Sequence, residues 1–317
     1  MRFRKIFGRG EGEGIGLALG SGGARGLSEI GVLLWLKEQG ISPCCVAGSS
    51  IGAILGAAIA AGRSPEYLRD TALDITWADK VKFLRPSLKG RSIFEWKRIG
   101  GFLEDIFEDV RIEDLEMPFA CVATDIDTGM EFVFRQGRVL DAVTASAAIP
   151  GAFPPVEIKG MHLVDGQVVN PVPVDVAFDL GAKKVIGVNV CRSVHTERMM
   201  YDSEEPSLKS RVDGWVRTVI ERNPLSRLGL IDSTELERKL DSLRDDRNVI
   251  DIITDSIAII SSRMMSMNLL DAGPHYLIRP EVGGYQDFDF EHAEDIIERG
   301  YRAAEESREE VLEFVGA

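Results

Sequence analysis

The chain has 317 residues, a hydrophobic fraction of 44% and a formal net charge of −14. This is enough apolar sequence to bury the core of one large α/β domain or of two ordinary domains. The acidic balance argues against general nucleic-acid binding, which requires a basic face that replaces the counterions around phosphate groups.

Targeting and metal-binding signals are weak throughout the sequence. The basic start, residues 1–7, lacks the apolar stretch of a signal peptide, and the mildly apolar run 46–61 is too short to span a bilayer. None of the four cysteines belongs to a CxxC pair, and no His/Asp/Glu cluster has the spacing of metal ligands. We therefore expect a cytoplasmic protein with no metal site and no cofactor.

The first elements alternate between short apolar runs and helical patterns. Ile15–Leu19 is predicted as a buried strand, which enters the glycine loop Gly20–Gly26 and then a helix that stops at Gly40. A second strand closes with Val46 and Ala47, and a helix of small residues follows from about residue 50 to residue 61.

The same alternation continues to the end of the chain. Strands are predicted at 119–124, 131–134, 162–164, 184–190 and 276–279, and helices at 139–148 and 290–314. The stretch 208–270 is mostly helical and charged. This order predicts a three-layer α/β/α fold with a mainly parallel central sheet. We expect a single domain over 1–317, with a core of about 14–190 and 274–317 and a helical insertion at about 195–270.

Gly48-Ser49-Ser50-Ile51-Gly52 matches the pattern G-x-S-x-G. A nucleophilic serine between a strand and a helix needs a sharp, strained turn, and small residues two positions before and after it allow that turn. The following helix points its N-terminal amides toward a forming oxyanion. Alternatively, the serines only cap a buried Gly/Ala helix.

The glycine loop admits several interpretations. It is not a Walker A loop, because Leu27 follows Gly26, and it is not a dinucleotide fingerprint, because Arg25 stands where the third glycine is needed. It can form an oxyanion hole, in which successive amides at a helix start bind an anion. Gly22 and Gly23 would allow the backbone to approach the substrate oxygen closely, and Arg25 would either brace the loop or neutralise nearby charge. A tight turn without a ligand is the remaining alternative.

Asp165-Gly166 follows a short strand, where a carboxylate can reach a nucleophile. By itself this dipeptide favours a β-turn.

The separated motifs together resemble the patatin-like phospholipase family over about residues 14–190. The resemblance rests on the order and spacing of the loop, the serine turn and the Asp-Gly pair, and on three further segments: Ala123-Thr124-Asp125, the run from Ala145 to Pro155, and Asn170 to Pro173. Two positions depart from the family pattern. Gln167 follows Asp-Gly where Gly or Ala is common, and Ser21 stands where Gly is common.

The resemblance implies a patatin-like fold and a Ser–Asp dyad. Ser50 would be the nucleophile and Asp165 the general base, with the oxyanion held around Gly22, Gly23, Ala24 and Arg25. Gly48, Gly52 and Gly166 would be the structural glycines of the two motifs. The substrate would be an acyl ester of a phospholipid or lysophospholipid. The alternatives are a non-catalytic lipid-binding or regulatory protein on the same fold, or an acyltransferase or thioesterase.

Three further features carry weaker hypotheses. The histidines His162, His195, His275 and His292 offer a formal Ser-Asp-His triad, although His162 and Asp165 are expected on opposite faces of their strand. Basic and aromatic residues at 77–98 and at 2–7 suit a peripheral contact with an anionic membrane, or else a solvated loop. The Met-containing stretch 257–270 suits an acyl-binding lid or an ordinary core helix. The oligomeric state is left open.

Overall fold

The computed structural model describes residues 14–74, 96–191, 249–270 and 272–316. In chain order its strands and α-helices are β1 Ile15–Leu19, α1 Ser28–Glu38, β2 Cys45–Ser49, α2 Ile51–Ala60, α3 Pro65–Asp74, α5 Trp96–Phe107, β3 Phe119–Asp125, β4 Glu131–Phe134, α6 Val139–Ser146, β5 Val156–Ile158, β6 Met161–Asp165, α7 Val174–Asp179, β7 Lys184–Val188, α12 Val249–Leu270, β8 His275–Ile278, α13 Ala293–Glu306 and α14 Arg308–Val315. Short 3-10 turns lie at Gly23–Leu27, Ile112–Asp114, Gly166–Val168 and Phe290–His292.

One mixed sheet is the framework of the described residues. Its order is β5-β6-β3-β2-β1-β7-β8, with β4 paired to β3. The neighbouring strands β3, β2, β1, β7 and β8 are parallel to one another. The strands β4, β5 and β6 pair antiparallel at the β3 side of the sheet. The prediction of an α/β fold with a mainly parallel sheet is confirmed. The structure shows in addition that the remaining strands of the sheet are antiparallel.

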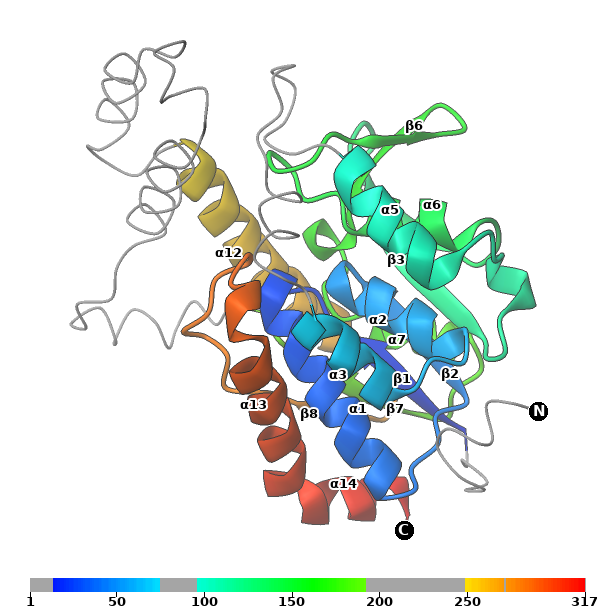
Figure 1. Cartoon of the computed structure of the whole chain (residues 1–317), viewed down its shortest axis with the longest axis vertical. Coiled ribbons are helices and arrows are strands. Elements are labelled where there is room, and N and C mark those ends of the chain that lie inside the picture. The colour runs from blue at the N-terminus through cyan, green and yellow to red at the C-terminus, as the bar shows by residue number, and fades with distance from the viewer. Residues whose placement is uncertain (1–13, 75–95, 192–248, 271, 317) are drawn as a thin grey trace, which may run out of the picture. The chain divides into compact units, whose positions relative to one another are not determined.

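Helices cover both faces of this sheet (Figure 1). Along β1, Leu17 and Leu19 belong to one buried cluster and Ala18 to the other, as the alternation of side chains along a strand requires. The first cluster includes residues of α1, α2, α6 and α13, and the second those of α7 and the C-terminal part of α12. The three-layer arrangement follows from these two apolar faces.

Several elements differ from the sequence prediction, which did not include the helices α3, α5 and α7. The strand β5 was not predicted, because it is short and only partly buried and therefore contains no apolar run. The terminal helix predicted at 290–314 is divided into a 3-10 turn, α13 and α14. The division falls at Ser307, whose hydroxyl donates to the Ala303 carbonyl at 2.9 Å and competes with the helical bonding there.

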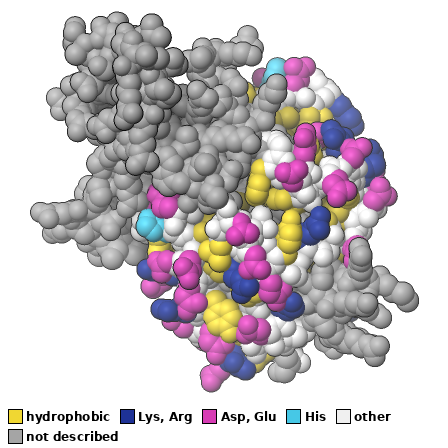
Figure 2. Space-filling view, viewed as in Figure 1, with side chains coloured by type: hydrophobic (Ala, Val, Ile, Leu, Met, Phe, Trp, Pro, Cys, Tyr) yellow, Lys and Arg dark blue, Asp and Glu magenta, His cyan; other side chains and the backbone are white. Residues whose placement is uncertain are grey.

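The chain divides into two compact units, residues 1–193 with 257–317, and residues 194–256. Most of the second unit lies outside the described residues, so the helical insertion at about 195–270 stays a prediction apart from the helical conformation of α12. Within the part described, no helix is both long enough and apolar enough to cross a membrane. On the visible described surface, acidic side chains intermingle with Lys and Arg (Figure 2).

Candidate active site

Ser50 occupies the corner between β2 and α2 in a backbone conformation that is rare for a residue with a side chain. Its φ is 57° and its ψ is −122°, which costs on the order of 1–3 kcal/mol. A Cβ on Gly48 would lie 2.4 Å from the Gly52 carbonyl oxygen, and a Cβ on Gly52 would lie 2.3 Å from the Leu19 oxygen. Both glycines of the predicted turn are therefore required by the close approach of three backbone segments.

The strand β3 brings Asp165 next to this corner. The last residue of β2, Ser49, pairs with Val122, and the next residue of β3, Ala123, pairs with Asp165 of β6. β6 thus continues along the same edge of β3 at the point where β2 ends. A Cβ on Gly166 would lie 2.3 Å from the Val122 oxygen, so the glycine after the aspartate allows this close packing.

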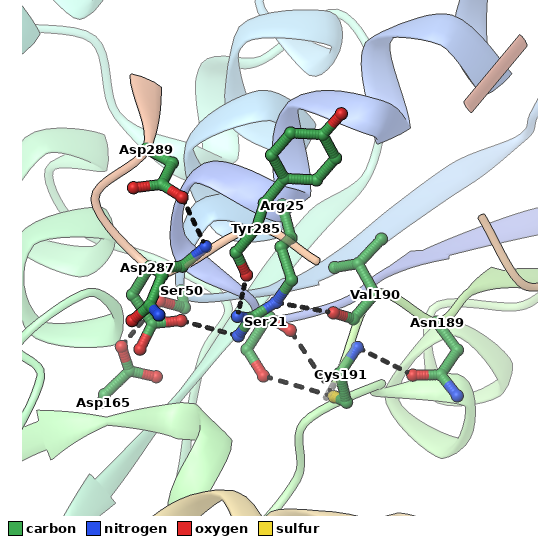
Figure 3. Close-up of polar contacts among 11 residues, drawn as sticks. Ser21, Arg25, Ser50, Asp165, Asn189, Val190, Cys191, Tyr285, Asp287 and Asp289 are labelled. Carbon is green, nitrogen blue, oxygen red and sulfur yellow. Dashed lines mark hydrogen bonds and ion pairs between the residues drawn. The ribbon is translucent and has the colours of Figure 1, made fainter. Parts of the chain in front are cut away.

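The two predicted reacting side chains are directly hydrogen-bonded (Figure 3). Ser50 Oγ donates to Asp165 Oδ2 at 2.6 Å, and the Gln167 amide donates to Asp165 Oδ1 at 2.8 Å. Both Ser50 and Asp165 are buried. Burial raises the pKa of Asp165 to about 7, against the lowering effect of its two hydrogen bonds, and the negative Asp287 adds to the rise. A carboxyl with such a pKa can exchange a proton with a hydroxyl near neutral pH.

Neighbouring polar groups fix the orientation of this pair. The Ser50 amide donates to Ser146 Oγ at 3.0 Å, and Thr124 Oγ1 donates to the Asp165 carbonyl at 2.9 Å. The Asp165 amide donates to the Ala148 carbonyl at 3.0 Å. Sequence reasoning assigned no role to Ser146, because nothing in its spacing from Ser50 indicates that α6 packs against the serine turn.

Backbone amides of the glycine loop form hydrogen bonds both before Gly22 and after Gly23. The Gly20 amide donates to Glu29 Oε1 at 2.6 Å and the Ser21 amide to the Pro171 carbonyl at 2.9 Å. Farther along, the Ala24 amide donates to the Asp287 carbonyl at 2.8 Å and the Arg25 amide to the Gly22 carbonyl at 3.2 Å.

This pattern divides the predicted oxyanion-binding set. The amides of Ala24 and Arg25 already have acceptors, whereas those of Gly22 and Gly23 donate to no group in the described part of the chain. Gly23 has a φ of 56°, which a glycine adopts without strain. The two adjacent amides are therefore the donors that remain for an anion at this end of the loop.

Arg25 connects the glycine loop to the residues that follow β7 and β8. Its guanidinium is buried, and Nη2 forms an ion pair with Asp287 at 2.6 Å. Nη1 donates to the Tyr285 carbonyl at 2.9 Å and Nε to the Val190 carbonyl at 3.3 Å (Figure 3). Sequence reasoning did not identify Asp287 or Tyr285, since no motif surrounds them.

The described histidines form no hydrogen bond with the Ser–Asp pair. His162 is exposed and bonds Asp127 at 2.7 Å, which agrees with the expectation that it faces away from Asp165. His275 bonds the Gly273 carbonyl, and the His292 ring lies 5.7 Å from that of Tyr285. The predicted basic and aromatic segments at 2–7 and 77–98, and His195, lie outside the residues whose side chains are described.

The Met-containing stretch 257–270 forms the C-terminal part of α12. Met265 and Leu269 pack against the second buried cluster, whereas Met267 is exposed. Ser261 Oγ donates to the Gln167 carbonyl at 2.8 Å, so this helix contacts the turn that follows Asp165. One face of the helix is thus a core face, and the lid hypothesis concerns the other face.

Comparison with known proteins gives matches over the region that contains the site. A sequence model described as patatin-like phospholipase matches residues 17–178. An uncharacterised NTE family protein of Mycobacterium tuberculosis is 38% identical over 172 residues, which are 54% of this chain and 48% of that protein. The patatin-like phospholipase domain-containing protein 7 of Rattus norvegicus is 30% identical over 292 residues, which are 90% of this chain and 20% of the rat protein.

Among solved structures, VipD from Legionella pneumophila aligns with a TM-score of 0.44 and 12% identity, covering 93% of this chain and 66% of VipD. The chain spans about half the length of the mycobacterial relative and about a fifth of the length of the rat relative. The family model extends over about half of the chain and includes the glycine loop, the serine turn and Asp165. This chain belongs to the patatin-like phospholipase family.

Proposed function

We propose that the protein is a serine hydrolase that cleaves acyl esters of phospholipids or lysophospholipids through a Ser50–Asp165 dyad and an acyl-enzyme. The observation that carries the proposal is the 2.6 Å hydrogen bond from Ser50 Oγ to the buried Asp165 carboxylate, at a strained turn between a strand and a helix. The family membership supports a lipid acyl hydrolase in general.

In the first half-reaction, Ser50 Oγ attacks the ester carbonyl carbon while Asp165 accepts the hydroxyl proton. The carbonyl oxygen becomes an oxyanion and receives hydrogen bonds from the free amides of Gly22 and Gly23. Collapse of this intermediate breaks the bond to the alcohol part of the substrate. The departing alkoxide takes the proton from Asp165, which leaves an acyl ester on Ser50 and an ionised Asp165.

In the second half-reaction, water replaces the alcohol. Asp165 accepts a proton from the water as its oxygen attacks the acyl carbonyl, and the same two amides bind the second oxyanion. Expulsion of Ser50 Oγ, which regains the proton from Asp165, releases the fatty acid. The base is regenerated without a histidine because the carboxyl itself has a pKa of about 7.

A lipid substrate fits the described surface around α12. Ile259, Ile260 and Met267 are exposed on this helix, whose Ser261 contacts the turn after Asp165. Exposed apolar side chains on a helix that contacts this turn suit an acyl chain or a bilayer surface. The proposal also includes the peripheral membrane contact, at the cytoplasmic side, that the sequence predicts for the segments 2–7 and 77–98.

The test is labelling with a fluorophosphonate probe followed by a panel of phospholipids and lysophospholipids. Wild type is expected to be labelled and to release fatty acid, whereas Ser50→Ala and Asp165→Asn are expected to lose both reactions. The matched control is Ser49→Ala, one residue before the nucleophile. The Ser49 hydroxyl is buried and has no hydrogen-bond partner among the described residues, so its removal should leave labelling intact.

Each result separates one alternative. Labelling that persists in Ser50→Ala would show that another residue is the nucleophile. Failure of the folded wild type to react would support the non-catalytic lipid-binding alternative. Labelling without fatty acid release, but with transfer of the acyl group to an added alcohol or thiol, would support an acyltransferase.

A further inference from the structure

The segment between β8 and α13 lies against the glycine loop, although more than 250 residues separate them in the sequence. The strands β1, β7 and β8 are adjacent and parallel, so their carboxyl ends lie at the same edge of the sheet. The glycine loop leaves this edge from β1, and the segment containing Tyr285 and Asp287 leaves it from β8. Asp287 stands beyond the range 17–178 that the family model matches.

Asp287 contacts the loop through both its main chain and its side chain, and Figure 3 shows the side-chain contact with Arg25. Its carbonyl oxygen accepts from the Ala24 amide at 2.8 Å, and its Oδ1 pairs with Arg25 Nη2 at 2.6 Å. The Arg25 side chain is only 8% exposed, so its charge depends on this one carboxylate for neutralisation among the described groups. A buried guanidinium that loses its partner is strongly unfavourable, which makes this pair a firm link between the two segments.

The two backbones are also in direct contact. A Cβ on Gly23 would lie 2.4 Å from the Asp287 carbonyl oxygen and 2.8 Å from its Cα. The absence of a side chain at Gly23 thus allows the segment to approach the loop. Because the Ala24 amide donates to Asp287, Gly23 is the last residue of the loop whose amide is free within the described part of the chain. The orientation of the Gly22 and Gly23 N–H groups therefore depends on the position of Asp287.

The segment itself is anchored from behind. The Gln286 amide donates to Asp289 Oδ2 at 2.9 Å, and the Tyr285 amide donates to the Val282 carbonyl at 3.1 Å. The following helix α13 packs closely on α1 at Gly300, where an added Cβ would lie 1.7 Å from the Ser28 carbonyl oxygen. These contacts give Asp287 a fixed base from which to hold Arg25.

Asp287 also affects the reacting pair electrostatically. Its negative charge contributes to the raised pKa of Asp165. Among the described residues, the other charged or titratable groups around this cluster are Arg25, the fully buried Glu29, Cys191, and Asp289, which accepts from the Gln286 amide. Arg25 is the only cation among them, so neutralising Asp287 would leave its positive charge unpaired and make ionisation of Asp165 easier.

We propose that Asp287 is a positioning residue of the active site, which holds Arg25 and Ala24 so that the Gly22 and Gly23 amides point at the oxyanion. This proposal rests on the proposed function. A small displacement of oxyanion donors weakens them in the transition state more than in the bound substrate. The expected effect is therefore on kcat, with little effect on KM.

The test compares Asp287→Asn with Glu291→Gln in the full-length protein, by using the ester that wild type hydrolyses best. Glu291 is an exposed carboxylate on the same segment, so its variant removes an equal charge at a short distance. Asp287→Asn is expected to lower kcat about 10- to 100-fold, with KM within about 3-fold of wild type. The acid limb of its pH–rate profile should move to lower pH, because a negative charge near Asp165 has been removed. Glu291→Gln should match wild type.

A double variant, Arg25→Gln with Asp287→Asn, tests whether the two side chains act as one unit. If they do, its loss of kcat should be close to that of Arg25→Gln alone, whereas independent residues would give the product of the single losses. The same comparison serves if Asp287→Asn alone folds poorly, because the double variant leaves no unpaired buried charge. Circular dichroism of each variant provides the fold check.

The results distinguish this inference from the proposed function. If Asp287→Asn has the kcat and pH profile of wild type, or if the losses in the double variant multiply, the positioning role is wrong while labelling of Ser50 still supports the hydrolase. If wild type shows neither labelling nor turnover, the proposed function fails and the positioning role fails with it.

Discussion

Replacing Asp165 by Asn should abolish turnover and stabilise the fold, and the stabilisation should grow with pH. The carboxyl is fully buried, and its pKa is raised from the ordinary value of 3.8 to about 7. Below pH about 4 the group is protonated in both the folded and the unfolded chain, so its ionisation costs nothing. As the pH rises above 4 the unfolded chain ionises first, and the folded state loses stability until the pH passes 7.

The size of this effect follows from the two pKa values. The pKa rises by about 3, and each increase of one in pKa corresponds to about 1.4 kcal/mol. Ionisation of Asp165 therefore lowers the free energy of unfolding by about 4 kcal/mol at pH 9. About half of it, roughly 2 kcal/mol, develops between pH 5.5 and pH 9. Asn has nearly the same shape, can accept the Gln167 amide and can donate to Ser50, and it carries no charge. Its free energy of unfolding should therefore exceed that of wild type by an amount that increases over this range.

The measurement is urea unfolding at several pH values from 5.5 to 9, followed by tryptophan fluorescence. The control is Asp114→Asn, which changes an exposed carboxyl in the 3-10 turn Ile112–Asp114 and should show no such pH dependence. A difference between Asp165→Asn and wild type that is constant with pH, or that decreases as the pH rises, would refute the assignment of a buried carboxyl with a raised pKa.

Three further outcomes follow from the same geometry. The kcat/KM of wild type should fall about tenfold for each pH unit below about 7, because the carboxyl of the dyad must be ionised to accept a proton; a profile flat to pH 5 would contradict this. Gly48→Ala should give no folded, active protein, since its Cβ would lie 2.4 Å from the Gly52 oxygen, whereas Gly100→Ala, in an open part of α5, should fold as well as wild type in thermal melts. Ser146→Ala should lower the free energy of unfolding by about 1–3 kcal/mol and reduce labelling of Ser50, whose buried amide would lose its acceptor; an unchanged labelling rate would show that the bond is dispensable.

Local sequence patterns were sufficient to predict the serine turn. The apolar run before Gly48, the small residues at 48 and 52 and the helical stretch after them all belong to one short window, and the structure has β2, Ser50 and α2 in these positions. The pairing of Asp165 with Ser50 could be expected only from the family resemblance. Its physical cause is the change of partner along β3, from β2 to β6, which no local pattern encodes.

The supporting residues were beyond prediction for a related reason. Arg25 could be suggested as a brace because it lies in the glycine loop, but its partner Asp287 depends on the parallel pairing of β7 with β8. The sequence around Asp287 has no motif, and a single aspartate in an acidic C-terminal region is most often solvated. The contact exists because β8 lies beside β7, which in turn pairs with β1. It can therefore be recognised only when the order of the strands is known.

The strand order also explains why this edge of the sheet holds the site. The chain moves from β1 to β2 on one side, and later returns to pair β7 with β1 on the other side, so the strand order reverses direction beside β1. In open α/β sheets, loops separate at such a point and leave a crevice at the carboxyl ends of the strands.

Each side of this point contributes a different part of the site. The dyad is held by β2, β3 and β6, whereas the glycine loop is held by residues that follow β7 and β8. Chemistry that requires both parts therefore depends on the correct docking of two halves of the sheet. Substitutions that displace Tyr285 or Asp287 from the glycine loop should consequently change the rate of acyl transfer, even though both residues lie far in sequence from the nucleophile.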